Sequence, residues 1–353
     1  MIRKITILFT LAVCVLSKSL LAQDIHFSQY YLSPLVQNPA LTGSFTELTR
    51  VSAIYRDQWY RVSSEPFHTA AVSYDMGRKK DKWIVKGSKA PDENYLGLGG
   101  MIYYDQNGVG RLSNLSFVFA VAYHIFLNNK NRISFGAEAG YTQRQIDYNA
   151  LLVNNQYNSN SGQFDHSLPN METFNKNKVT YPSLHAGFAW NHSFINPRWK
   201  SYFGSGFFNL LTPKESFIKT DNKLNMRISS YLALDYIVNA KSVFRSMLSF
   251  QTQSKAQEIN TGFLYSHKNT GSLYTLFLGC QARFSPANKI FDAVFPNVGF
   301  KYKKIRMGLS YDVNLSSLKQ ASTYQGGPEL GIIYTTGTTK IHEVERVIPC
   351  ETF

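Results

Sequence analysis

The feature that most constrains this sequence is an alternation of apolar with polar or small residues, recurring in segments of about ten residues. Residues 113–127 show it most clearly. The apolar set there is Leu115, Phe117, Phe119, Val121, Tyr123, Ile125 and Leu127, and the opposite set is Ser116, Ala120, Ala122 and His124. Because successive side chains of a β-strand point to opposite faces, this pattern predicts a strand with one apolar and one polar face.

The alternation recurs along most of the chain, which predicts an antiparallel sheet of about fourteen strands. The predicted strands are residues 48–59, 67–76, 95–105, 113–127, 132–142, 181–191, 199–209, 225–236, 242–251, 257–267, 272–284, 293–302, 305–313 and 328–336. Charged and small residues on the second face need a polar or wet interior. The sequence therefore predicts an all-β fold, a transmembrane antiparallel β-barrel of about 14 strands.

Composition and connection lengths bear on this fold. Aromatic residues make up 14% of the chain, with 22 Tyr and 25 Phe, as the aromatic girdles of a barrel require. A soluble β-sandwich, with its apolar faces turned inward, is the competing interpretation. Connections alternate in length, as periplasmic turns and surface loops do. The short ones are 128–131, 238–241, 267–271 and 303–304, and the long ones are 147–180, 210–224 and 314–327. The segment 147–180, rich in Asn, Ser and Gln, is expected to be an external loop, mobile or capping the pore.

One connection breaks this alternation. Residues 77–94 are long although they fall on the predicted periplasmic side, and they carry Lys79, Lys80 and Lys82. A solvated loop is the simpler interpretation. The alternative hypothesis is a docking site for an acidic periplasmic partner, whose approach such a patch would steer.

The N-terminus has the features of a secretory signal peptide. Arg3 and Lys4 precede the apolar run 5–16, and small residues follow at 19–22. Cys14 raises the alternative of a lipid anchor, which the bulky Val13 disfavours. We therefore expect an exported protein of the cell outer membrane. Its predicted parts are a signal peptide (1–22), an N-terminal periplasmic or plug segment (23–46), a transmembrane barrel (47–336) and a C-terminal segment (337–353).

The motifs of familiar catalytic sites are missing or out of context. No His-Glu-x-x-His or Cys-x-x-Cys occurs, and the eight His are scattered, so neither a metal nor another cofactor is expected. The glycines at 97–100 lie inside a predicted strand rather than in a phosphate-binding turn. A catalytic residue is not predicted, although a barrel lipase using His68, His185 or His267 stays open as an alternative. The formal net charge of +14 suits lipopolysaccharide or an acidic protein; an exported barrel rarely meets nucleic acid, so none is expected.

An ordered set of motifs resembles the PorP/SprF family of the type IX secretion system in Bacteroidetes, from about residue 24 to the C-terminus. The motif residues are Phe27, Ser28, Gln29, Tyr30, Tyr31, Asn38, Pro39, Tyr55, Arg56, Asp57, Gln58, Trp59, Pro66, Phe67, His68, Tyr311, Asp312, Ser317, Leu318, Pro349 and Cys350. The chain departs from the family pattern at 209–213 and 327–329, where family His residues are replaced, and at 242–244.

The resemblance implies a non-enzymatic fourteen-stranded outer-membrane barrel. Such proteins support the export and surface attachment of large adhesins, including gliding adhesins, that carry a C-terminal sorting domain. Other members tie the outer membrane to the periplasmic ring of the secretion machinery through a peptidoglycan-binding protein. We expect this chain to be the partner of one adhesin; an anchor of the machinery and a passive porin are the alternatives.

The N-terminal motif also has a physical interpretation. Pro34 and Pro39 break regular structure, and Tyr30 and Tyr31 are too apolar for a free tail. We therefore expect this segment to plug the lumen or to pack against the periplasmic rim, with direct contact to the exported adhesin as the alternative. Charge pairing of Arg56 and Asp57 inside the lumen is expected to fix the first strand.

Overall fold

The computed structural model describes residues 27–60, 65–78, 94–165, 167–169, 171, 176–217, 222–269, 271, 273–286, 290–316, 319–320 and 322–337. Fourteen strands form one closed barrel. They are β1 (Thr49–Gln58), β2 (Phe67–Arg78), β3 (Tyr95–Asn107), β4 (Leu112–Asn128), β5 (Asn131–Gln145), β8 (Lys178–Ser193), β9 (Trp199–Phe208), β10 (Arg227–Asn239), β11 (Ser242–Gln253), β12 (Ala256–Lys268), β13 (Tyr274–Ser285), β14 (Ile290–Tyr302), β15 (Ile305–Asn314) and β16 (Gln325–Thr336). Every predicted strand is present.

The barrel closes between its first and last strands. β1 pairs antiparallel with β16, from Thr49 opposite Thr336 to Arg56 opposite Glu329. Each remaining strand pairs antiparallel with its neighbours in chain order. Closure leaves no strand edge unpaired, which a sheet surrounded by lipid requires. The pairing of the two strands extends to Thr336, and residues 338–353 lie outside the described part of the chain.

The distribution of polarity is inverted relative to a soluble protein. Large apolar side chains point outward, with Phe119 60% and Leu278 63% exposed. Charged side chains are buried inside, with Asp235 fully buried and Glu138 1% exposed. A soluble sandwich would place these two sets the other way round. The observed arrangement is that of a barrel with a lipid-facing exterior and a polar lumen.

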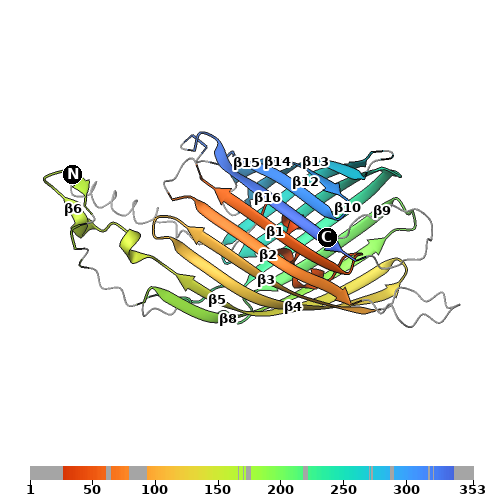
Figure 1. Ribbon diagram of the computed structural model, residues 1–353, viewed down its shortest axis with the longest axis horizontal. Helices are drawn as coiled ribbons and strands as arrows, with labels where there is room; N and C mark the ends of the chain where they lie inside the picture. The colour runs from red at the N-terminus through yellow and green to blue at the C-terminus, as the bar shows by residue number, and fades with distance from the viewer. Residues whose placement is uncertain are drawn as a thin grey trace, which may run out of the picture.

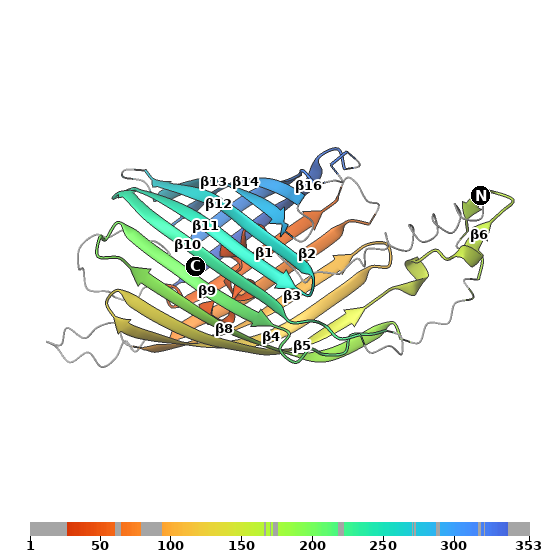
Figure 2. The ribbon, with the colours of Figure 1, turned by 180° about the vertical axis from the view of Figure 1, so that it is seen from behind.

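The two ends of the barrel differ. One end, here called the short-turn end, has the connections 129–130, 240–241 and 303–304; the opposite, long-loop end has the connections 146–177, 209–226 and 315–324. In Figures 1 and 2 the small hairpin of β6 (Tyr157–Asn158) and β7 (Gln163–Phe164) lies well beyond the barrel at the long-loop end. The expectation that this loop caps the pore is therefore wrong for its described hairpin.

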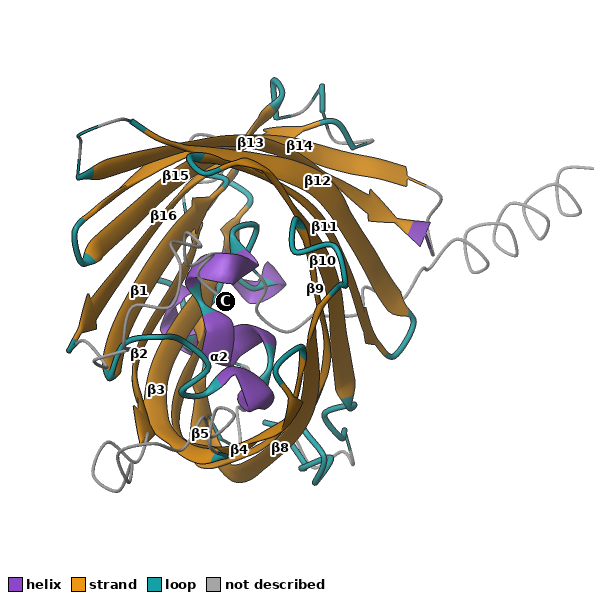
Figure 3. Ribbon diagram, turned by 90° about the vertical axis from the view of Figure 1, so that its right-hand side faces the viewer, coloured by secondary structure: helices purple, strands orange, loops and turns teal. Residues whose placement is uncertain are grey.

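The lumen contains the N-terminal segment of the chain. Three short helices lie inside the barrel wall in Figure 3: η1 (Tyr30–Leu32), α2 (Pro34–Gln37) and η2 (Pro39–Leu41). Their apolar side chains pack against inward-facing wall residues such as Ile54, Ala120 and Met247. No described helix is long and apolar enough to cross a membrane. The segment 27–46, here called the plug, thus forms the core of the barrel.

Candidate functional site: the plugged lumen

The plug runs through the lumen toward the short-turn end. Ser28 contacts Asp312, near the long-loop end of β15. Further along the plug, the Thr42 carbonyl is 2.8 Å from His124 Nε2, near the short-turn end of β4. The backbone of Gly77, near the short-turn end of β2, donates to Leu48, the residue before β1. The beginning of the plug, at Ser28, therefore lies nearer the long-loop end of the barrel. Leu48, just before β1, lies nearer the short-turn end.

Glu329 on β16 fixes the beginning of the plug. Its carboxylate accepts hydrogen bonds from the Ser28 backbone N–H (2.8 Å, to Oε2) and the Gln29 backbone N–H (2.6 Å, to Oε1). The Gln29 side chain donates to the Glu329 carbonyl at 3.1 Å. All three residues are buried. Two charge-assisted bonds donated by consecutive amides to one carboxylate hold this backbone in a single orientation.

Asp312 on β15 joins the plug to two basic wall residues. It accepts from the Ser28 hydroxyl at 2.9 Å and from Arg56 Nη2 at 2.7 Å, and Arg283 on β13 also donates to it. The two guanidinium groups offset the buried charges of Asp312 and Glu329. Motif residues from the beginning, the first strand and the end of the sequence thus meet in one buried network.

The middle of the plug is held by shape as well as by hydrogen bonds. The Asn38 side chain donates to the Phe188 carbonyl of β8 at 2.8 Å, and its oxygen accepts the Ala40 N–H at 2.9 Å. Pro39 starts η2, where its missing N–H has no consequence. A Cβ on Gly136 of β5 would lie 2.5 Å from the Ala40 nitrogen, so only glycine allows this close approach.

A second ion pair fixes the end of the plug. Arg50 on β1 binds Asp75 on β2 through two bonds, Nε–Oδ1 at 2.9 Å and Nη2–Oδ2 at 2.6 Å. Asp75 Oδ2 also accepts the Gly43 N–H at 2.7 Å, and Arg50 Nη2 donates to the Leu41 carbonyl at 3.1 Å. The plug is therefore anchored along its whole described length.

The structure brings most motif residues together. Buried in the lumen are Phe27, Ser28, Gln29, Tyr30, Asn38, Pro39, Arg56 and Asp312. Gln58 and Trp59 lie outside this network, at the end of β1; the Trp59 N–H donates to the Gly326 carbonyl at 3.0 Å with a φ of 67°. Ser317, Lys79, Lys80 and Lys82 lie outside the described residues, so their expected roles stay predictions.

The structure corrects one expectation about the first strand. Arg56 forms the expected lumenal ion pair, but Asp57 does not, because alternate residues of β1 face outward. Asp57 Oδ1 lies 3.5 Å from His68 Nδ1, on the side that carries the exposed Tyr55. Adjacent residues of a strand cannot share a face, so only one of the two charges can enter the lumen.

Sequence reasoning did not select Glu329, Arg283, Arg50 or Asp75 as site residues. The available signal was a charged residue at an inward position of an alternating strand. Ser242 Oγ and His267 Nδ1 also lie 2.9 Å apart, a pairing that sequence did not reveal, at the short-turn end of β11 and β12. In the described part of the chain, no group of three or more His, Cys, Asp or Glu could hold a metal ion.

A closed barrel with an apolar exterior and a plugged polar lumen is an outer-membrane β-barrel protein. A sequence profile of the family described as type IX secretion system membrane protein PorP/SprF matches residues 19–327. The chain belongs to this family, and so takes part in type IX secretion at the outer membrane. A search of curated protein sequences gave no match.

Solved structures share the fold at low sequence identity. One is a deltaS2 mutant of the TodX monoaromatic hydrocarbon channel, with a TM-score of 0.50 and 9% identity over 87% of this chain and 94% of that one. Others are the CymD monoaromatic hydrocarbon channel (0.49, 10%, 87% and 93%) and a Pseudomonas aeruginosa FadL homologue (0.47, 11%, 86% and 94%). At these identities the likeness concerns the barrel fold alone.

Proposed function

We propose that this protein is a non-enzymatic partner barrel that supports the export and surface attachment of one large adhesin carrying a C-terminal sorting domain. Membership of the type IX secretion family supports a role with exported polypeptides. The observation that carries the proposal is the plug. Its buried ion pairs and hydrogen bonds make the lumen a packed core, which suits a binding platform better than a diffusion pore.

The proposal gives different parts of the barrel different partners. The adhesin binds at the long-loop end, where polar loops with scattered aromatic residues offer adaptable contacts. Outward-facing aromatic and aliphatic side chains contact outer-membrane lipid and lipopolysaccharide. Periplasmic type IX components, including a peptidoglycan-binding protein, contact the short-turn end. No catalytic residue, cofactor or nucleic acid takes part.

The test is affinity purification of the tagged protein from gently solubilised outer membranes, followed by mass spectrometry. An unrelated tagged barrel from the same membrane is the control. Recovery of one large adhesin, with loss of that single surface protein when the barrel is absent, supports the proposal. Recovery of periplasmic ring components alone, with loss of all type IX cargo, indicates an anchor of the machinery instead. Recovery of neither, together with steady conductance in planar bilayers, indicates a passive porin.

Deleting residues 24–40 separates a structural plug from direct adhesin contact. A structural plug predicts an unstable or conducting barrel, because the buried charges of Glu329 and Asp312 lose their partners. A stable, sealed barrel that fails only to retain the adhesin would assign the segment to adhesin contact. Heat-modifiable mobility on gels and bilayer conductance distinguish the two.

A further inference from the structure

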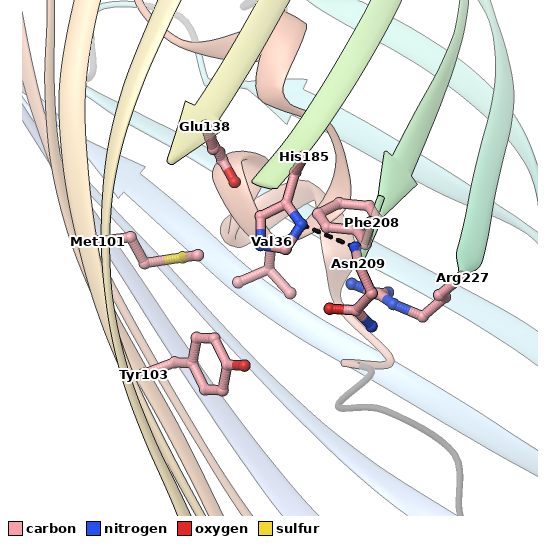
Figure 4. Close-up of a pocket in the computed structure, with 8 residues that line it drawn as sticks. All are labelled: Val36, Met101, Tyr103, Glu138, His185, Phe208, Asn209 and Arg227. Atoms are coloured by element: carbon pink, nitrogen blue, oxygen red, sulfur yellow. Dashed lines mark hydrogen bonds between the residues drawn. The ribbon is translucent and has the colours of Figure 1, made fainter. Parts of the chain in front are cut away.

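A small pocket lies in the lumen between the plug and one side of the wall. Its lining, drawn in Figure 4, comprises Val36, Met101, Tyr103, Glu138, His185, Phe208, Asn209 and Arg227. Val36 belongs to α2 of the plug, and the others belong to or directly follow strands β3, β5, β8, β9 and β10. Phe208 ends β9 and Arg227 begins β10, so the pocket lies on the plug's long-loop side.

The pocket contains a buried carboxylate without a hydrogen-bond partner. Glu138 is 1% exposed, and neither of its oxygens has a donor within hydrogen-bond distance. The guanidinium of Arg227, also in the pocket, lies 4.0 Å from the centre of the Phe208 ring, and its Nη1 donates to Gln251 at 3.3 Å. Its charge acts on Glu138 without a hydrogen bond to that carboxylate. A buried carboxylate without a donor is costly, and a cationic donor relieves that cost.

His185 is the residue directly opposite Glu138 on the neighbouring strand. Its Nδ1 accepts the Asn209 backbone N–H at 3.0 Å, so in the neutral ring Nε2 carries the proton. A nitrogen that carries a proton cannot bind a metal ion. Glu138 and His185 therefore do not form a metal site, and the carboxylate is left to bind an organic cation.

The remaining walls define the shape of that cation. Val36 and Met101 supply aliphatic surface, and Tyr103 supplies an aromatic ring, whereas the Phe208 ring is already covered by Arg227. An alkyl stem packs against such a surface, and aromatic faces attract a cationic group. A lysine or arginine side chain combines an apolar stem with a terminal donor that can pair with Glu138.

We propose that this pocket binds the side chain of a lysine or arginine residue from a polypeptide that reaches into the barrel from the long-loop end. The identity of that polypeptide as the exported adhesin rests on the function proposed above. The cation selectivity of the pocket does not.

The first test uses the side-chain analogues n-butylammonium and n-butylguanidinium, with n-butanol as the uncharged control. Ligand-observed NMR measures their binding to the intact protein in detergent. We expect saturable binding of at least one cation and none of butanol, and binding at least tenfold weaker in Glu138→Gln. Glu258→Gln, at a buried lumenal carboxylate outside the pocket, is the matched control and should bind as the unaltered protein does. Absence of cation binding, or equal binding in Glu138→Gln, would overturn the proposal.

A second variant keeps the proposal testable if Glu138→Gln does not fold. Val36→Phe fills the pocket from the plug and leaves Glu138 in place, so it should weaken cation binding by a similar factor. Heat-modifiable mobility verifies that each variant forms a barrel. Cation binding that persists in a folded Val36→Phe protein would place the site elsewhere and overturn the assignment.

The second test distinguishes a polypeptide from a free amine. Tyr103→p-benzoylphenylalanine places a photo-crosslinker at the pocket in living cells. We expect a cross-linked polypeptide whose yield falls at least fivefold when Glu138→Gln is added. Butylammonium binding without a polypeptide cross-link would identify the ligand as a small organic cation and overturn the polypeptide assignment. Co-purification of the adhesin unchanged by Glu138→Gln would leave the proposed function intact and overturn this inference alone.

Discussion

The backbone N–H of Ser28 and the carboxylate of Glu329 are joined across the lumen by a 2.8 Å hydrogen bond, although 301 positions separate them in the chain. The same carboxylate accepts the N–H of Gln29 through its other oxygen. The first residues of the plug are therefore fixed by the last strand of the barrel. Because of this contact, a change at the single wall residue Glu329 tests whether the plug is held in place.

Replacing Glu329 with Ala should loosen the beginning of the plug. The change removes two charge-assisted acceptors from buried amides, and we expect a loss of about 3 kcal/mol in the free energy of unfolding. Urea titration in detergent measures this loss, and bilayer conductance reports whether the lumen opens. Glu65→Ala is the control, because its salt bridge with Arg111 at the rim is largely exposed and should change stability by less than about 1 kcal/mol.

Asp312→Ala should lower the free energy of unfolding by more than Arg56→Ala does. Removing Asp312 leaves both Arg56 and Arg283 without this shared buried acceptor, at a cost of about 3–5 kcal/mol. Removing Arg56 leaves Asp312 still paired with Arg283. Comparison of both single variants with the double variant measures the coupling. If the two single variants lose equal free energy of unfolding, Asp312 does not hold the network together.

Phe119→Arg should impair insertion of the barrel. Phe119 points outward from the middle of β4 and is exposed, and an arginine facing lipid at the bilayer midplane costs about 2–4 kcal/mol. Outer-membrane abundance and heat-modifiable mobility measure the effect. Leu152→Arg, at an exposed position of the long loop, is the matched control. If both variants insert equally well, Phe119 does not face lipid.

Reversing Lys79, Lys80 and Lys82 to Glu should weaken co-purification of an acidic periplasmic partner, because the reversal turns attraction into repulsion. These residues lie outside the described part of the chain, so this prediction rests on sequence alone. Reversal of Lys303 and Lys304, in a short turn at the same end of the barrel, controls for a general change of charge. Unchanged recovery of the partner would identify 77–94 as a plain solvated loop.

The strands could be predicted from sequence because the different environments of the two faces of each strand determine its residue pattern. Lipid on one face and a polar lumen on the other impose a period of two, so Phe117 and Phe119 alternate with Ser116 and Ala120. The plug has no such periodic pattern in its sequence. It is surrounded by the barrel on all sides, and its helices of three and four residues are too short to show a helical period.

The contacts between plug and wall could not be predicted for a different reason. Which inward residue contacts Ser28 depends on the register of every strand pair around the barrel. No local sequence pattern specifies the combined registers of all these pairs. Asp312 and Arg56 were visible as motif residues, whereas Arg283, the second basic partner of Asp312, was not. Asp57 shows the limit of motif reasoning, because the motif includes it and strand geometry turns it outward.

The bond between the beginning of the plug and β16 also sets an order for assembly. Ser28 and Gln29 emerge early during synthesis, long before their acceptors on β15 and β16. The beginning of the plug cannot be secured until the final strands have joined the barrel, so an incompletely inserted barrel leaves Ser28 and Gln29 without these acceptors. Quality-control proteases that recognise unbound chain termini would therefore distinguish an unfinished barrel from a finished one.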